Sequence, residues 1–274
     1  ILFDPMNEGV DYIEIYNRSE KVIGLNSFVL CSYDSISQKF EEICDIGTKG
    51  QLIFPKEYIL LSTEPDIVKN QYTTSNSNEF IKLATFPDFN KEAGIAVLAL
   101  KNLSLKLDML TYSAEMHNPL LASTKGVSLE RIHFNNASND KTNWHSAAET
   151  VGFGTPGYIN SQYVSEQLSN TMIQLSPDIF SPDNDGYQDV LTINYSFEEA
   201  GYFCSIAIYD ANGRLIRQLI PKTLCGVSGS FSWDGVTDEH ETAPEGIYII
   251  YLEIMDIKGN VKHIKKTTVL ALKK

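Results

Sequence analysis

The sequence has no hydrophobic run long enough to cross a membrane. Its longest apolar stretches, such as residues 94–100, fall far below the ~18 to 20 residues that a spanning helix requires. Positive charge is also scarce, because 22 Lys and Arg residues stand against 35 Asp and Glu residues, a net charge of −13. A nucleic-acid backbone repels such a chain, so we expect no nucleic-acid partner.

One basic cluster lies close to the C-terminus. It comprises Lys262, Lys265, Lys266, Lys273 and Lys274. A solvated strand edge followed by a frayed tail explains these lysines more simply than a binding site does.

Motifs of enzyme active sites are missing as well. Residues 152–157 satisfy the G-x-G-x-x-G pattern, but Pro156 and a polar segment follow where a dinucleotide-binding loop opens a helix. No nucleophile elbow, phosphate-binding loop or zinc-protease motif occurs. The histidines are scattered without the spacing of a metal face, and we expect them at the surface or in turns: His117, His133, His145, His240 and His263. The sequence therefore predicts a non-catalytic protein.

Cysteine is sparse, and its four copies fall into two local pairs, Cys31 with Cys44 and Cys204 with Cys225. Neither pair has the C-x-x-C spacing of redox and metal motifs. A disulfide within each pair closes a loop of about 14 to 22 residues and contributes roughly 3 kcal/mol in the chain-entropy model. Disulfides suit an exported protein, and buried free thiols are the alternative.

Almost every readable segment alternates between apolar and polar residues or forms a short β-branched and aromatic run, which predicts strands. The strands expected in the first half span 11–16, 27–33, 38–46, 57–62, 94–100, 105–112 and 127–133. Only residues 64–72 have a helical pattern. The chain opens on Ile1-Leu-Phe-Asp-Pro5, which is typical of the middle of a strand, with no secretory signal before it. We therefore expect the native N-terminal region to lie further upstream.

A polar segment after residue 160 divides the chain, whose 274 residues suit two domains. We predict a first domain over 1–160, a linker over 161–174 and a second domain over 175–274. Strands in the second domain are expected at 190–196, 203–209, 214–220, 229–233, 246–255 and 261–270. Regular short strands with Asn and Gly turns predict an all-β chain of two immunoglobulin-like β-sandwiches in tandem.

Both halves resemble known families. Residues 1–160 resemble the bacterial lamin-tail domain through Asp11-Tyr-Ile-Glu-Ile-Tyr-Asn17, Leu25-Asn-Ser-Phe-Val-Leu30, Val127-Ser-Leu-Glu-Arg131, Asn143-Trp144 and Gly154-Thr-Pro-Gly157. Residues 175–270 are similar to the Ig-like domain of flagellar hook-capping proteins and to C-terminal modules of gliding-motility and type IX secretion substrates. That likeness is carried by Phe180-Ser-Pro-Asp-Asn-Asp-Gly186, Ile208-Tyr-Asp-Ala-Asn-Gly-Arg214, Phe231-Ser-Trp-Asp-Gly235, Pro244-Glu-Gly-Ile-Tyr248 and Asp256-Ile-Lys-Gly-Asn-Val261.

The resemblance implies a non-catalytic module of a larger exported bacterial protein, located at the cell surface, in the periplasm or outside the cell. Its expected role is protein–protein interaction, scaffolding or sorting. The expected partners are envelope or secretion-system proteins, or upstream domains of the same chain. The alternative is a carbohydrate-binding accessory region of a secreted hydrolase, with Tyr158, Tyr163, Tyr187, Tyr202, Tyr248 and Tyr251 as candidate platform rings.

The best candidate for a metal site is the acidic loop at residues 183–189. Asp183, Asp185 and Asp189, with the permissive Gly186, have the side chains to surround Ca²⁺ with oxygen ligands. The loop lacks the spacing and the final Glu of an EF-hand. The alternative is a turn, in which the same residues let the backbone enter the left-handed region. No other cofactor is predicted.

Overall fold

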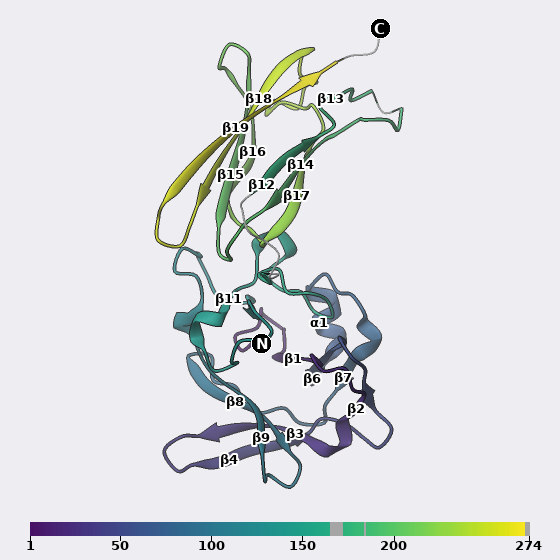
Figure 1. Ribbon diagram of the computed structural model, residues 1–274, viewed down its shortest axis with the longest axis vertical. Coiled ribbons are helices and arrows are strands. Elements are labelled where there is room, and N and C mark those ends of the chain that lie inside the picture. Colours follow the sequence, from purple (N-terminus) through teal and green to yellow (C-terminus); the bar gives the residue numbers. More distant parts are fainter. Residues whose placement is uncertain (165–171, 184, 272–274) are drawn as a thin grey trace. The chain divides into compact units, whose positions relative to one another are not determined.

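The computed structural model describes residues 1–164, 172–183 and 185–271, and the chain divides into two compact units, Ile1–Tyr163 and Val164–Lys274. Strands dominate both units (Figure 1), which confirms the all-β prediction. The α-helix of the described residues, α1 (Pro65–Gln71), lies within the segment predicted to be helical. None of the helices in the described part of the chain is long and apolar enough to span a membrane.

The first unit contains two main sheets. One sheet has the order β1-β6-β7 and the other has the order β4-β3-β8-β9. Their strands are β1 (Tyr12–Tyr16), β3 (Phe28–Asp34), β4 (Lys39–Asp45), β6 (Tyr58–Ser62), β7 (Phe80–Lys82), β8 (Ala93–Leu100) and β9 (Lys106–Ser113). Two small ladders pair β2 (Ile23–Gly24) with β5 (Leu52–Ile53) and β10 (Leu129–Arg131) with β11 (Trp144–Ser146). Short 3₁₀ turns occupy Leu25–Ser27, Ser77–Glu79, Ala114–Met116, Lys141–Asn143 and Glu149–Val151.

The main core of this unit gathers side chains from both sheets. Its most buried members include Leu30 of β3, Ile59 and Leu61 of β6, and Tyr112 of β9. The alternation of these strands sends every second side chain to one face, so each sheet contributes an apolar face to the shared core.

Two asparagines fix the turns that leave these strands. The Asn17 side-chain amide donates to the backbone oxygens of Lys21 at 2.8 Å and Ile53 at 3.2 Å. Asn143 donates to the oxygen of His133 at 2.9 Å and accepts from its N–H at 2.8 Å. Buried backbone groups at these irregular turns have no ladder partner, and the amides supply one.

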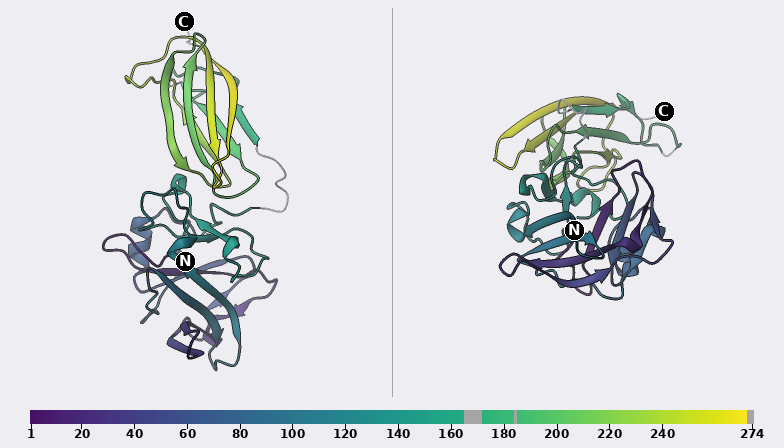
Figure 2. Two further views of the ribbon diagram at one scale, coloured as in Figure 1. Left: turned by 90° about the vertical axis from the view of Figure 1, so that its left-hand side faces the viewer. Right: turned by 60° about the horizontal axis from the view of Figure 1, so that its bottom comes forward.

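The second unit is a sandwich of a three-stranded sheet, β12-β14-β17, and a five-stranded sheet, β13-β19-β18-β15-β16. The strands are β12 (Met172–Ser176), β13 (Ile179–Phe180), β14 (Leu191–Ser196), β15 (Phe203–Asp210), β16 (Leu215–Leu224), β17 (Ser228–Trp233), β18 (Gly246–Met255) and β19 (Val261–Leu270). The green and yellow strands of the larger sheet run side by side in Figure 2. β18 and β19 pair antiparallel over ten residues each.

Aromatic rings fill the core of this sandwich. Trp233 is fully buried, and its ring lies 5.3 Å from that of Phe180 and 5.0 Å from that of Tyr248, centroid to centroid. The Trp233 indole N–H donates to the oxygen of Val236 at 2.9 Å, so the buried ring has its one polar group satisfied.

Glycine and aspartate residues determine the conformation of the hairpin turns in the second unit. Gly213 and Gly259 have φ values of 80° and 85°, the left-handed region in which a side chain is strained. Their N–H groups donate to the oxygens of Asp210 and Asp256, at 3.0 and 3.1 Å. The aspartate carboxylates accept further backbone N–H groups, so each turn is closed by its own sequence.

The predicted linker, 161–174, overlaps strand β12, which begins at Met172, while residues 165–171 lie outside the described residues. Strand β11 was also not predicted, because its three residues are too short for a period of two to be recognised.

Shortening Phe180 to alanine should destabilise the second unit by about 3–5 kcal/mol, the range for buried aromatic residues. Phe180 has no exposed surface, so the variant leaves a cavity beside Trp233. Urea denaturation followed by tryptophan fluorescence and circular dichroism measures the loss. The control is Tyr187→Ala, because Tyr187 is 70% exposed. Equal stability of the two variants would contradict the assignment of this core.

Candidate functional site

The acidic loop of the second unit brings Asp183, Asp185 and Asp189 together. One carboxylate oxygen from each lies within 4.8 Å of the others, a spacing that fits oxygens around one Ca²⁺. Backbone N–H groups of the loop already bind some of these carboxylate oxygens, because Asp185 N donates to Asp183 Oδ1 and Gly186 N donates to Asp189 Oδ2. Asp189 Oδ1 is buried and has no hydrogen-bond partner among the described residues. Both the calcium and the turn interpretation fit these contacts, and the calcium site stays a prediction.

The four cysteines are buried thiols. Cys44 stands opposite Leu30 in the β3–β4 ladder, next to a bulge that displaces Cys31 from direct pairing. In the second unit a hydrogen bond between the two thiols and burial raise the pKa of Cys225, so Cys204 and Cys225 lie side by side. Disulfide formation in either pair stays a prediction.

Two of the predicted surface histidines, His117 and His145, are instead buried in the first unit. His117 Nδ1 lies 3.0 Å from Ser146 Oγ, and His145 Nδ1 lies 3.1 Å from Ser146 O. Burial lowers the pKa of His117 to about 4 and lowers that of His145. Both rings are therefore neutral at pH 7 and act as satisfied polar groups of the core.

The six tyrosines considered as a carbohydrate platform pack separately. Tyr248 contacts Trp233, Tyr251 stacks on His263 and Tyr202 contacts Phe197. Among the described residues, no ring contact joins any two of the six. Tyr251 also has Lys265 over its ring at 5.9 Å, which further covers the face that a sugar ring needs. The geometry thus gives no support to a sugar platform.

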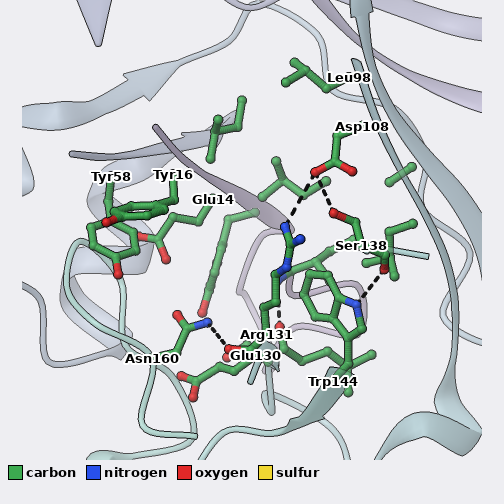
Figure 3. Close-up of a pocket in the computed structure, with 18 of the residues that line it drawn as sticks. Glu14, Tyr16, Tyr58, Leu98, Asp108, Glu130, Arg131, Ser138, Trp144 and Asn160 are labelled. Carbon is green, nitrogen blue, oxygen red and sulfur yellow. Dashed lines mark hydrogen bonds and ion pairs between the residues drawn. The ribbon is translucent and has the colours of Figure 1, made fainter. Parts of the chain in front are cut away.

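Sequence reasoning missed a cavity of about 210 Å³ inside the first unit. It lies between β1, the four-stranded sheet and β10. Its wall towards the four-stranded sheet is apolar and includes Leu30, Leu98 and Leu110. Asp108 of β9 adds a polar group to this wall. The other walls carry polar and aromatic groups (Figure 3): Glu14, Tyr16, Tyr58, Glu130, Arg131 and Asn160.

Two carboxyl groups beside this cavity, those of the half-buried Glu14 and the buried Glu130, are hydrogen-bonded to the 154–162 loop. Glu14 Oε1 accepts from Gly157 N at 2.6 Å. Glu130 accepts from Thr155 Oγ1 at 2.6 Å, Ser161 Oγ at 2.7 Å and Gln162 N at 3.1 Å. Burial raises the pKa of Glu14 to about 8 and raises that of Glu130, against the effect of these donors. The Glu14 carboxyl is therefore largely protonated at pH 7.

Arg131 forms a second polar wall. Its Nη1 lies 3.7 Å from Asp108 Oδ2, which also accepts from Ser138 Oγ at 2.6 Å (Figure 3). Its Nη2 donates to the oxygen of Asn136, and Nε is buried with no partner among the described residues. Burial lowers the pKa of Arg131, and Asp108 opposes that shift.

A cluster of tilted aromatic rings borders the same cavity. Tyr16 lies 4.7 Å from both Tyr58 and Phe134, and Phe134 lies 4.5 Å from Tyr163, centroid to centroid. The sequence gives one sign of this site, because Glu14 is an acidic residue inside an otherwise apolar and aromatic strand, whereas Glu130 lies in the mixed strand Leu129–Arg131. Only the fold shows that they meet.

Fold and site together define an all-β chain with a cavity in its first unit and an acidic loop in its second. Residues 174–270 match the family described as "CHU_C Type IX secretion signal domain". The match covers the strands of the second unit from β12 to β19. It identifies a sorting or secretion-related, non-catalytic module and a protein directed out of the cell or to its surface.

A search of curated proteins found no match. Among solved structures, the chain is similar to dimeric latent PorU from Porphyromonas gingivalis, with 11% identity, a TM-score of 0.30, and coverage of 96% of this chain and 18% of that one. PorZ, a surface component of the type IX secretion system of the same bacterium, gives 18% identity and a TM-score of 0.28, over 64% of this chain and 20% of that one. CopC from Methylosinus trichosporium OB3b gives 14% identity and a TM-score of 0.25, over 38% of this chain and 97% of that one. The chain thus spans about a fifth of PorU and PorZ, and similarity at these scores assigns no function.

Replacing Glu14 with glutamine should remove a pH-dependent loss of stability. The folded-state pKa of Glu14 is raised from 4.5 to about 8. Its contribution to the free energy of unfolding is therefore fully present below pH 4.5 and is lost as the pH rises through 8. The amide keeps an oxygen for Gly157 N–H and does not ionise. Melting temperatures of wild type and Glu14→Gln, measured from pH 5 to pH 9, should therefore diverge in favour of the variant as the pH rises.

The matched control for this experiment is Glu41→Gln on the exposed face of β4. The difference in melting temperature between Glu41→Gln and the wild type should stay constant with pH. If Glu14→Gln also gave a constant difference, the carboxyl would be ionised in the folded state, and the buried, protonated form would be wrong.

The calcium prediction has its own test. Calcium held by Asp183, Asp185 and Asp189 should raise the melting temperature of the second unit at millimolar concentration, because binding to the folded state stabilises it by mass action. Asp189→Asn should abolish this rise. Magnesium at the same concentration should raise the melting temperature only slightly. An unchanged melting temperature of the wild type in calcium would leave the loop as a turn only.

Proposed function

We propose that the second unit is the type IX sorting signal of this chain and that the first unit is exported with it as a non-catalytic interaction module. The observation that carries this proposal is the family match, which covers residues 174–270 and thus nearly all of the second sandwich. A sorting signal has to present a folded surface to the secretion machinery. The aromatic core around Trp233 supplies the rigidity that such a surface needs.

For the first unit we propose a lamin-tail type of domain. The residues that carry this resemblance contact one another across long stretches of sequence. Glu14 binds Gly157, Glu130 binds Thr155, and Asn17 and Asn143 fix turns. Motifs that lie far apart in the sequence thus join one network of hydrogen bonds, as expected if they define one fold. This supports the resemblance without assigning a ligand.

The role proposed for this first unit is binding and scaffolding at the cell surface or in the periplasm. Proteins of the envelope or of the secretion system, or further domains of a longer chain, are the proposed partners. Open sheet edges offer one mode of contact, because an extended segment pairs readily with an unpaired strand. In the first unit β4 and β9 end the four-stranded sheet, and in the second unit β16 ends the five-stranded sheet.

The sorting proposal is tested in a bacterium that has a type IX secretion system. The 274-residue chain is expressed behind a general export signal, beside a variant that lacks residues 174–270. We expect the full chain at the cell surface or in the medium, and the variant in the periplasm. A strain without the type IX system should retain both. Equal release of both chains from the wild-type strain would overturn the sorting role.

A further inference from the structure

The pairing of β15 with β16 brings Cys204 and Cys225 onto one face of the five-stranded sheet. Cys204 stands opposite Thr223 in this antiparallel ladder. Cys225 directly follows β16, and its N–H donates to the oxygen of Tyr202 at 2.9 Å, so the pairing continues for one more residue on each strand. Side chains opposite each other share a face, as do those two positions apart along a strand. Cys225 therefore points to the same side as Tyr202 and Cys204.

That side is the core of the second sandwich. Cys204 and Cys225 belong to the same apolar cluster, in which they are 1% and 0% exposed. Their side chains contact each other through a thiol–thiol hydrogen bond. A disulfide has an S–S bond of about 2.05 Å and needs two side chains that point towards each other. Two sulfur atoms already in contact reach that bond mainly by rotation of their side chains.

The other two cysteines lie on opposite faces of the four-stranded sheet. Cys31 packs with Val97 in a cluster outside the main core, and its Sγ donates to the oxygen of Val97 at 3.5 Å. Cys44 stands opposite Leu30, a residue of the main core, and so shares its face. Thr85 Oγ1 donates to Cys44 Sγ at 3.3 Å on that side. The sheet separates the two sulfur atoms, and a bond between them would require β3 or β4 to turn over.

The destination of the protein supplies an oxidant. The family match identifies a protein directed out of the cell or to its surface. Disulfides form and persist in such compartments, where the oxidant is another disulfide that exchanges with protein thiols. Both requirements of a disulfide, contact between two thiols and an oxidising compartment, are thus met by the pair in the second unit.

We propose that a disulfide joins Cys204 and Cys225 in the exported protein. Cys31 and Cys44 remain thiols in the same molecules. One thiolate of the pair attacks the S–S bond of the oxidant and displaces one of its sulfurs as a thiolate. The second thiolate of the pair attacks the mixed disulfide and displaces the other sulfur of the oxidant. The pair loses two protons and two electrons, and the oxidant becomes two thiols.

Burial determines when this bond forms. The attacking species is the thiolate, and the thiol–thiol hydrogen bond together with burial raises the pKa of Cys225 far above its usual value. Exchange therefore takes place before the sandwich closes, and the folded core shields the bond from reductants afterwards. The bond uses the export that the family match identifies and does not depend on the sorting role.

The disulfide fastens an edge strand. β16 ends the five-stranded sheet and lies beside β15 (Figure 1). The ladder between these two strands shifts its register at three places. A bond between Cys204 and Cys225 closes a loop of about 22 residues that contains all of β16, and so restricts the unfolded chain. It keeps the edge strand in place where its ladder is irregular.

The test refolds the 274-residue chain from urea in a mixture of oxidised and reduced glutathione. N-ethylmaleimide added in urea then labels the remaining thiols, and mass spectrometry of the intact chain and of its peptides locates them. We expect labels on Cys31 and Cys44 and a linked peptide pair that contains Cys204 and Cys225. The same chain refolded with dithiothreitol should carry a label on each of its four cysteines.

A glutathione-refolded chain without this linked pair, or with a link between any other two cysteines, would overturn the proposal. This measurement uses the unaltered chain, so it decides the question even if a cysteine variant fails to fold.

Two matched variants measure the effect of the bond on stability. Cys31→Ala/Cys44→Ala keeps the proposed pair, and Cys204→Ala/Cys225→Ala removes it. We expect the first variant to melt about 10 °C higher after refolding with glutathione than after refolding with dithiothreitol, because the bond restricts the unfolded state. The second variant should melt at the same temperature after both treatments.

Both variants also carry Trp144→Phe, so that the fluorescence of Trp233 reports the second unit. An equal rise in melting temperature in the two variants would mean that the effect does not come from this bond, and it would overturn the proposal.

Discussion

The carboxyl groups of Glu14 and Glu130 hold the first unit together. Glu14 lies on the first strand of the β1-β6-β7 sheet, and its partner, Gly157, follows 143 residues later. Glu130 draws Thr155, Ser161 and the Gln162 N–H onto one side chain. A buried carboxyl without donors is costly, so the 154–162 loop has to close over these groups for the unit to be stable. The same closure completes the wall of the cavity.

The second unit is organised differently. Its core depends on apolar and aromatic packing around Trp233, and its polar groups act locally, inside turns such as those at Asp210 and Asp256. Because each turn is closed by neighbours in sequence, the unit needs few long-range polar contacts to fix its register. A unit built in this way is held together mainly by its own core and its own turns.

Much of the fold follows from alternation and turn chemistry in the sequence. Strands such as β3, β8, β15 and β18 are long runs of apolar, β-branched and aromatic residues, and they lie where such runs predict strands. Short strands such as β11 and β13 escape recognition, because two or three residues hold no period and are strands only through their partners. The burial of His117 and His145 was not predicted either, because the sequence does not show that both rings pack against Ser146.

The amino-acid sequence by itself determined the all-β class, most of the strands and the hairpin turns, because side-chain alternation and the backbone preferences of Gly, Asn and Asp act over a few residues. It also placed Asp183, Asp185 and Asp189 close together, since they share one loop. Only the tertiary structure decided the cavity between β1 and β10 and the meeting of Glu14 and Glu130 with the 154–162 loop. The contact of Glu14 with Gly157 joins residues 143 positions apart and those of Glu130 join residues 25 to 32 positions apart. Local propensity carries no information about which distant segment supplies the partner.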